Sequence, residues 1–151
     1  MTTGGVPRFG DLPAGAEHWH RRGAYGIASR GGRILLVEAP YGWALPGGGV
    51  RPDEAAGSAL AREFLEETGY EIRSTDAVAV AEQVLWDAGR SMFVVKECTF
   101  FACQIGGVTS GGAEADHTPA WVWSEGAADL LIEEASAWAV RTILAAGLLD
   151  G

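Results

Sequence analysis

Long hydrophobic runs are missing from this sequence. Nowhere in its 151 residues do about 18 apolar residues follow one another, and the first 15 residues contain no apolar core of signal-peptide length. We therefore expect a soluble, cytoplasmic protein without a membrane partner.

Basic side chains are also scarce, and lysine is almost absent. Eleven lysines and arginines face 20 aspartates and glutamates, a formal net charge of -9, and Lys96 is the only lysine. Proteins that bind nucleic-acid polymers usually present a basic face, so this charge argues against such a partner. A small polyanionic substrate would meet the same repulsion, so an acidic protein that handles phosphates needs divalent cations as intermediaries.

Cysteine occurs only twice, as Cys98 and Cys103. Residues five apart on one strand point to opposite faces, so a disulfide between them is geometrically unfavourable. We expect two buried thiols in a reducing compartment.

The order of sequence patterns predicts one α/β domain at 22–148 after a loosely structured, Gly- and Pro-rich lead-in at 1–21. Helices should cover a mixed sheet, because strand patterns and helix patterns alternate along the chain. The expected elements are two strands within 23–38 joined by a turn at 30–33, an irregular segment at 41–53, a helix at 53–68, strands at 77–85 and 91–105, a loop at 106–119, a short strand at 120–123 and a final helix at 129–146.

Three carboxylates share one face of the first predicted helix. Glu63, Glu66 and Glu67 stand at positions i, i+3 and i+4. Like charges at this spacing repel, but they become favourable when they bind hard cations such as Mg²⁺. The alternative is an exposed, solvated helix face, which is how most glutamate-rich helices behave.

A run of glycines precedes this helix. Gly47, Gly48 and Gly49 allow the backbone to approach a ligand closely. Glycine-rich turns are common for ordinary reasons, so this signal is weak alone. Together with the carboxylates it favours a site for phosphates and metal.

The stretch from Gly48 to Tyr70 resembles the signature motif of the Nudix hydrolases, a MutT-like family. The motif is a glycine, five residues, a glutamate, seven residues, then Arg-Glu-apolar-any-Glu-Glu-any-Gly-apolar. Its fixed positions are all filled at the correct spacing, by Gly48, Glu54, Arg62, Glu63, Glu66, Glu67 and Gly69. Tyr70 replaces the usual aliphatic residue at the end.

This resemblance implies the Nudix fold, a mixed sheet between helices with a catalytic loop–helix–loop. It implies that Glu63, Glu66 and Glu67 bind Mg²⁺, or Mn²⁺ as a substitute, with the backbone of Gly48 close to the metal. The reaction would be attack, usually by water, on a phosphorus of a nucleoside diphosphate linked to another group.

Supporting residues also follow from the resemblance. Arg62 and Glu54 would orient the metal-binding carboxylates. Many members add an acidic residue from a loop near the last strand, for which we expect Glu114, with Asp116 as the alternative. Neighbouring His117 is expected to be an ordinary surface histidine.

Three aromatic residues in or beside loops are candidates to stack on a base. They are Tyr41, Trp43 and Trp86, although packing in the core is an alternative for each. Trp86 lies where some subfamilies carry a proline for ADP-ribose or a tyrosine for dinucleoside polyphosphates, and neither is present. A nucleoside triphosphate, plain or modified, is therefore the expected small-molecule partner.

Other functions remain open. The domain could bind a nucleotide or nucleotide sugar without catalysis, in a regulatory role, or hydrolyse ADP-ribose or a nucleotide sugar. An isoprenoid diphosphate isomerase would need a catalytic cysteine, for which Cys98 and Cys103 are poorly placed in a strand. A homodimer is possible.

Overall fold

The computed structural model describes residues 5–108 and 116–149, without the side chain of Ser74. Its helices are α1 (Ala56–Thr68), α2 (Ser124–Leu130) and α3 (Glu134–Ala146). Its strands are β1 (Arg8–Phe9), β2 (His18–Arg30), β3 (Arg33–Ala39), β4 (Gly42–Ala44), β5 (Gly47–Gly49), β6 (Tyr70–Asp87), β7 (Met92–Val108) and β8 (Thr118–Trp123). In the described part of the chain no helix is long and apolar enough to cross a membrane.

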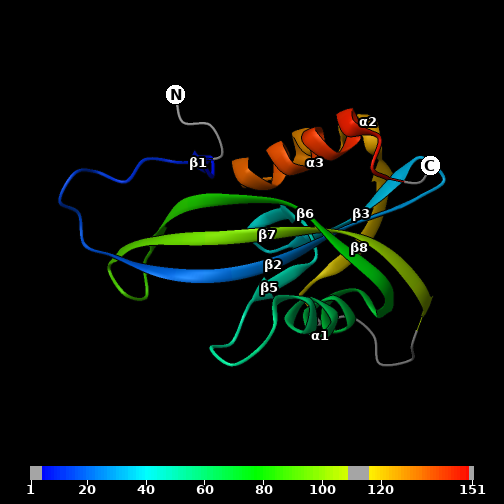
Figure 1. Cartoon of the computed structure of the whole chain (residues 1–151), viewed down its shortest axis with the longest axis horizontal. Coiled ribbons are helices and arrows are strands. Elements are labelled where there is room, and N and C mark those ends of the chain that lie inside the picture. Colours follow the sequence, from blue (N-terminus) through cyan, green and yellow to red (C-terminus); the bar gives the residue numbers. More distant parts are fainter. Residues whose placement is uncertain (1–4, 109–115, 150–151) are drawn as a thin grey trace.

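The strands form one mixed sheet in the order β1-β6-β7-β2-β3-β4, while β5 pairs with β2 and β8 with β3. β2 runs parallel to β7, and β6 runs antiparallel to β7. Helix α1 lies on one face of the sheet, and α2 and α3 lie on the other (Figure 1). The predicted α/β architecture, a mixed sheet between helices, is therefore confirmed.

Two apolar clusters fill the spaces between the sheet and its helices. Phe64 of α1 belongs to the first cluster, and Val140 of α3 belongs to the second. Cys103 lies in the cluster under α1 and Cys98 in the one under α3, so the two thiols occupy opposite faces as predicted. Both are free, and burial raises their pKa values, to about 11 for Cys98 and about 12 for Cys103.

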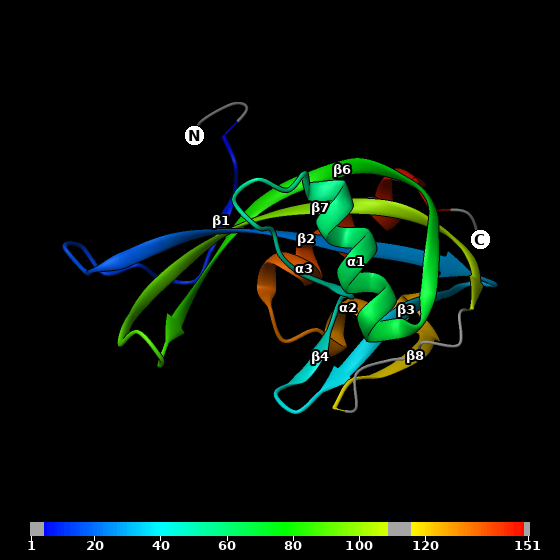
Figure 2. The same ribbon diagram turned by 90° about the horizontal axis from the view of Figure 1, so that it is seen from below.

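The expected loose lead-in at 1–21 is wrong where the structure describes strands. Arg8 and Phe9 pair with β6, and β2 begins at His18 and pairs with β7 from there on. The first residues of β2 are mostly exposed, so no apolar alternation signals the strand. Figure 2 shows β2, β6 and β7 continuing past the helices as a projecting arm.

The glycine-rich segment at 41–53 also contains strands where irregular structure was expected. Gly47–Gly49 pairs with Gly23–Tyr25 of β2 in an antiparallel register. Gly47 has φ of 145°, and a Cβ there would lie 2.7 Å from the Cα of Tyr25. Glycine is thus required because β5 packs directly against β2, a reason that the local sequence does not reveal.

The final helix is divided in two, whereas one helix at 129–146 was predicted. The chain leaves α2 at Leu131, which makes a bridge to Trp43, and re-enters a helix at Glu134. The backbone N–H of Ala135 donates to the side-chain oxygen of Gln83 at 2.8 Å. Apolar residues continue through the break, so helical periodicity conceals it. The break brings residue 133 to the cavity described next.

Candidate functional site

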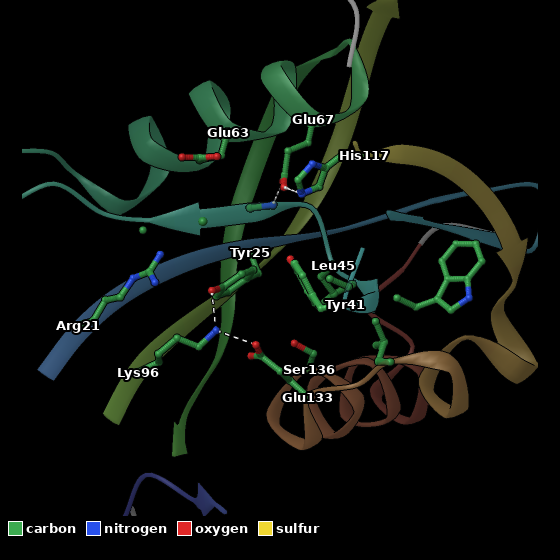
Figure 3. A pocket seen from close by; sticks show the side chains of 16 residues that line it. Arg21, Tyr25, Tyr41, Leu45, Glu63, Glu67, Lys96, His117, Glu133 and Ser136 are labelled. Atoms are coloured by element: carbon green, nitrogen blue, oxygen red, sulfur yellow. Dashed lines mark hydrogen bonds and ion pairs between the residues drawn. The ribbon is translucent and has the colours of Figure 1, made fainter. Parts of the chain in front are cut away.

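A cavity of about 310 Å³ lies between α1, β5 and the start of α3. Figure 3 shows carboxylates of α1 on one side of it and a lysine–glutamate pair on the other. Its walls are formed by Arg21, Tyr25, Tyr41, Trp43, Ala44, Leu45, Gly47, Gly48, Gly49, Glu63, Glu67, Lys96, His117, Leu131, Glu133 and Ser136. A hollow of this size suits a small molecule.

Two of the three predicted metal-binding glutamates face this cavity. Glu63 and Glu67 line it, and Glu67 is only 7% exposed. Glu66, also predicted, is exposed and does not line it. The structure therefore places Glu63 and Glu67 in the wall of the same cavity and leaves Glu66 outside it.

The glycines of β5 touch both inward-facing glutamates. The backbone N–H of Gly47 donates to Glu67 Oε1 at 2.8 Å. A Cβ on Gly48 would lie 2.8 Å from the carboxyl carbon of Glu63, so a side chain there would displace this carboxylate. The glycine run and the carboxylate face are thus two halves of one site.

Arg62 ties the helix to the loop before it. Its guanidinium donates to both oxygens of Glu54, at 3.1 and 2.9 Å, and to Glu63 Oε1 at 2.8 Å. The hydrogen bonds from Arg62 lower the pKa of Glu54 to about 2. Planar, two-pronged contacts of this kind fix orientation as well as charge. The geometry agrees with the orienting role expected of Arg62 and Glu54.

The oxygen-rich side of the cavity has the chemistry that Mg²⁺ prefers. Carboxylates of Glu63 and Glu67 and the adjacent backbone at Gly48 offer hard oxygen donors. Within residues 5–108 and 116–149, no three acidic, histidine or cysteine side chains converge as a ready-made metal cluster. Glu63 is turned toward Arg62, and Glu67 toward Gly47 and His117. The donor set fits a hard cation, whose binding would draw these carboxylates together.

His117 was expected to be a surface residue, but it lines the cavity. Its Nε2 lies 3.4 Å from Glu67 Oε2, and its Nδ1 lies 2.8 Å from Asp116 Oδ1. Asp116 itself is largely exposed. Glu114, the preferred loop acid, lies outside the described residues. The only sequence signal for His117 was its position directly before the last strand.

On the side of the cavity opposite the α1 carboxylates lies a buried hydrogen-bond network around a lysine, which the sequence did not predict. Lys96 Nζ donates to Tyr25 Oη at 3.1 Å and to Glu133 Oε2 at 2.9 Å. Burial alone would lower the pKa of Lys96, but the nearby oxygens of Tyr25 and Glu133 outweigh it and raise this pKa. Lys96 stood out in the sequence as the only lysine, but nothing there linked it to Glu133.

The predicted aromatic residues are divided between two places. Tyr41 and Trp43 line the cavity. Trp86 lies at the end of the β6–β7 hairpin, where its ring is 5.1 Å from that of Phe93. Trp86 does not line the cavity, so its predicted contact with substrate has no support from its position.

Comparisons with known proteins agree with the fold and the motif. A family model described as NUDIX domain matches residues 19–142. A Bacillus subtilis (strain 168) protein named "Putative 8-oxo-dGTP diphosphatase" is 39% identical over 89 residues, 57% of this chain and 52% of that protein. The chain thus spans about half the length of this relative.

A second relative and a solved structure match more of the chain. The "RNA pyrophosphohydrolase" of Rhodopseudomonas palustris (strain ATCC BAA-98 / CGA009) is 31% identical over 139 residues, 78% of this chain and 81% of that protein. The crystal structure of a MutT protein from Bacillus halodurans superposes with a TM-score of 0.66 at 19% identity, covering 80% of each chain, which shows a shared fold. On the family match over residues 19–142, the chain belongs to the Nudix family.

Proposed function

We propose that this protein is a Mg²⁺-dependent pyrophosphohydrolase that acts on a nucleoside triphosphate or a modified nucleoside triphosphate. The observation that carries the proposal is the pair Glu63 and Glu67, which lines the same partly aromatic cavity as Arg21. The names of the two relatives, an 8-oxo-dGTP diphosphatase and an RNA pyrophosphohydrolase, support hydrolysis of a phosphate anhydride.

The position of each residue in the cavity indicates its role in the proposed reaction. Glu63 and Glu67, oriented by Arg62 and by the N–H of Gly47, would hold the metal. Bound Mg²⁺ supplies charge neutralisation and Lewis acidity for the phosphates. Arg21, whose guanidinium lies along Gly49, is placed to contact phosphate oxygens.

The electrostatic balance of the cavity supports a metal requirement. Its acidic groups are Glu63, Glu67 and Glu133. Its basic side chains are Arg21, Lys96 and His117, of which Lys96 is already paired with Glu133 and His117 lies beside Glu67. A polyphosphate would therefore be repelled unless divalent cations accompany it. We expect no hydrolysis of the nucleotide without such cations.

A substrate screen with and without Mg²⁺ tests this proposal. It would include nucleoside triphosphates, ADP-ribose, nucleotide sugars and dinucleoside polyphosphates, and compare wild type with Glu67→Gln. Mg²⁺-dependent hydrolysis that the substitution abolishes is the expected result. Turnover that survives both EDTA and Glu67→Gln would refute the mechanism, and tight binding of a ligand without turnover would favour the regulatory alternative.

A further inference from the structure

A buried charge pair lies on the side of the cavity away from Glu63 and Glu67. Lys96 is 7% exposed and is the only lysine of the chain. Burying an ion pair costs desolvation energy, and an apolar pair of similar volume often serves stability equally well. Stability alone therefore gives no reason for a lysine here, and its place in the cavity wall suggests a ligand.

The pair offers a hydrogen-bond donor beside an acceptor. An ammonium group carries three N–H bonds, and two of those on Lys96 point to Tyr25 Oη and Glu133 Oε2. No hydrogen bond among the described residues uses its third N–H or Glu133 Oε1. Both residues line the cavity, so a ligand can use what remains.

The surrounding walls suit a flat ring. Leu45 and Leu131 are buried apolar residues, and Tyr41 and Trp43 add aromatic surface. In Figure 3 Tyr41 and Leu45 lie between the α1 carboxylates and the Lys96–Glu133 pair. A nucleotide with its phosphates at Glu63 would thus extend its base toward Lys96.

We propose that Lys96 and Glu133 are the specificity-determining residues of this site and that they read the edge of a purine with a 6-oxo and a 2-amino group. This inference rests on the proposed nucleotide hydrolase function. The 6-oxo oxygen of such a base would accept from Lys96, and its N1–H and 2-amino group would donate to Glu133. Tyr25 acts as a positioning residue, because its hydroxyl holds the ammonium from the other side.

Adenine fits this arrangement poorly. Its 6-amino group is a donor and would face the Lys96 ammonium, which is also a donor. Its N1 is an acceptor and would face the Glu133 carboxylate, which is also an acceptor. Adenine has no 2-amino group to donate to Glu133. The attachment of the phosphates fixes which edge enters, so the base cannot exchange the two positions. Hypoxanthine keeps the 6-oxo group and N1–H and lacks only the 2-amino group, so it should bind with intermediate affinity.

Calorimetric binding of GMP, IMP and AMP in the presence of Mg²⁺ tests the inference without turnover, because these monophosphates contain no anhydride bond to hydrolyse. Wild type should bind GMP about tenfold or more tightly than AMP, with IMP between them. Glu133→Gln should reduce the preference for GMP over IMP, and Lys96→Met should reduce the preference for either over AMP. Glu134→Gln, an identical change on an exposed neighbour outside the cavity, should leave all three affinities unchanged.

Equal affinity of wild type for GMP and AMP, or preferences retained by both Lys96→Met and Glu133→Gln, would overturn the assignment. Thermal melting of each variant checks its folding, and Lys96→Gln, whose amide can face either a 6-oxo or a 6-amino group, replaces Lys96→Met if that variant does not fold. Base preference in wild type without any nucleotide hydrolysis would refute the proposed function alone. Hydrolysis with no discrimination between GTP and ATP would refute this inference alone.

Discussion

The guanidinium of Arg62 contacts both carboxylate oxygens of Glu54, at 3.1 and 2.9 Å, across the loop that leads into α1. The same guanidinium reaches Glu63 Oε1 at 2.8 Å. Arg62 therefore fixes the position of a cavity carboxylate relative to a residue outside the helix. The orientation of Glu63 depends on a fork-shaped donor, which lysine cannot supply.

Replacing Arg62 by lysine should weaken metal binding while the fold persists. The charge remains, but the three contacts cannot be made together, so we expect a loss of about 10- to 100-fold in apparent Mg²⁺ affinity or in kcat. Titrating the activity of each variant with Mg²⁺ measures both its apparent Mg²⁺ affinity and its kcat. Arg141→Lys, on the exposed side of α3, is the matched control. Equal Mg²⁺ dependence in both variants would contradict an orienting role for Arg62.

The low pKa of Glu54 makes stability depend on pH in the acid range. Its hydrogen bonds from Arg62 lower this pKa from 4.5 to about 2 in the folded protein. The carboxylate is thus charged in the folded state where the unfolded chain has begun to bind a proton. Its contribution to stability is complete above about pH 4.5 and is lost as the pH falls toward 2.

Urea unfolding of wild type and Glu54→Gln between pH 2 and pH 6 measures this contribution. The difference in unfolding free energy between the two proteins should shrink as the pH falls. A difference that is constant over this range would show that Glu54 titrates alike in both states.

The chemistry of the site could be predicted from sequence because it depends on local spacing. Residues 63 and 67 are one helical turn apart, so a helix necessarily places them on one face. The same spacing could not show that Glu66 would point away from the cavity. That outcome depends on how α1 rotates against β5, which tertiary packing decides.

The rest of the site depends on contacts between distant segments. Lys96 and Glu133 are 37 residues apart and meet only because β7 and the start of α3 pack together. The break before α3 is held by Gln83 of β6, which receives the Ala135 N–H. The apolar pattern of the final helical stretch cannot show that Gln83 on another strand interrupts it. The sequence therefore predicted one continuous helix.

Strand β5 leads to a prediction about single glycines. Gly48→Ala should reduce activity by at least about tenfold, because the added Cβ would lie 2.8 Å from the Glu63 carboxyl carbon and displace it. Gly57→Ala is the matched control, since nothing lies within 4 Å of its Cβ position inside α1. That control should instead stabilise the protein by about 1 kcal/mol. Measurements of kcat and of the unfolding free energy, by chemical denaturation, of both variants test these two expectations.

Substitution of two exposed aromatic residues, Tyr41 and Trp86, tests which of them contacts the substrate. Tyr41 is 63% exposed and lines the cavity, whereas Trp86 is 58% exposed and lies near the end of β6, against Phe93 of β7. Because aromatic stacking on a base contributes about 1–3 kcal/mol, Tyr41→Ala should raise KM by about 5- to 150-fold. Trp86→Ala should leave KM unchanged, and both variants should melt close to wild type since neither side chain is buried. A rise in KM for Trp86→Ala alone would place the base on the arm and not in the cavity.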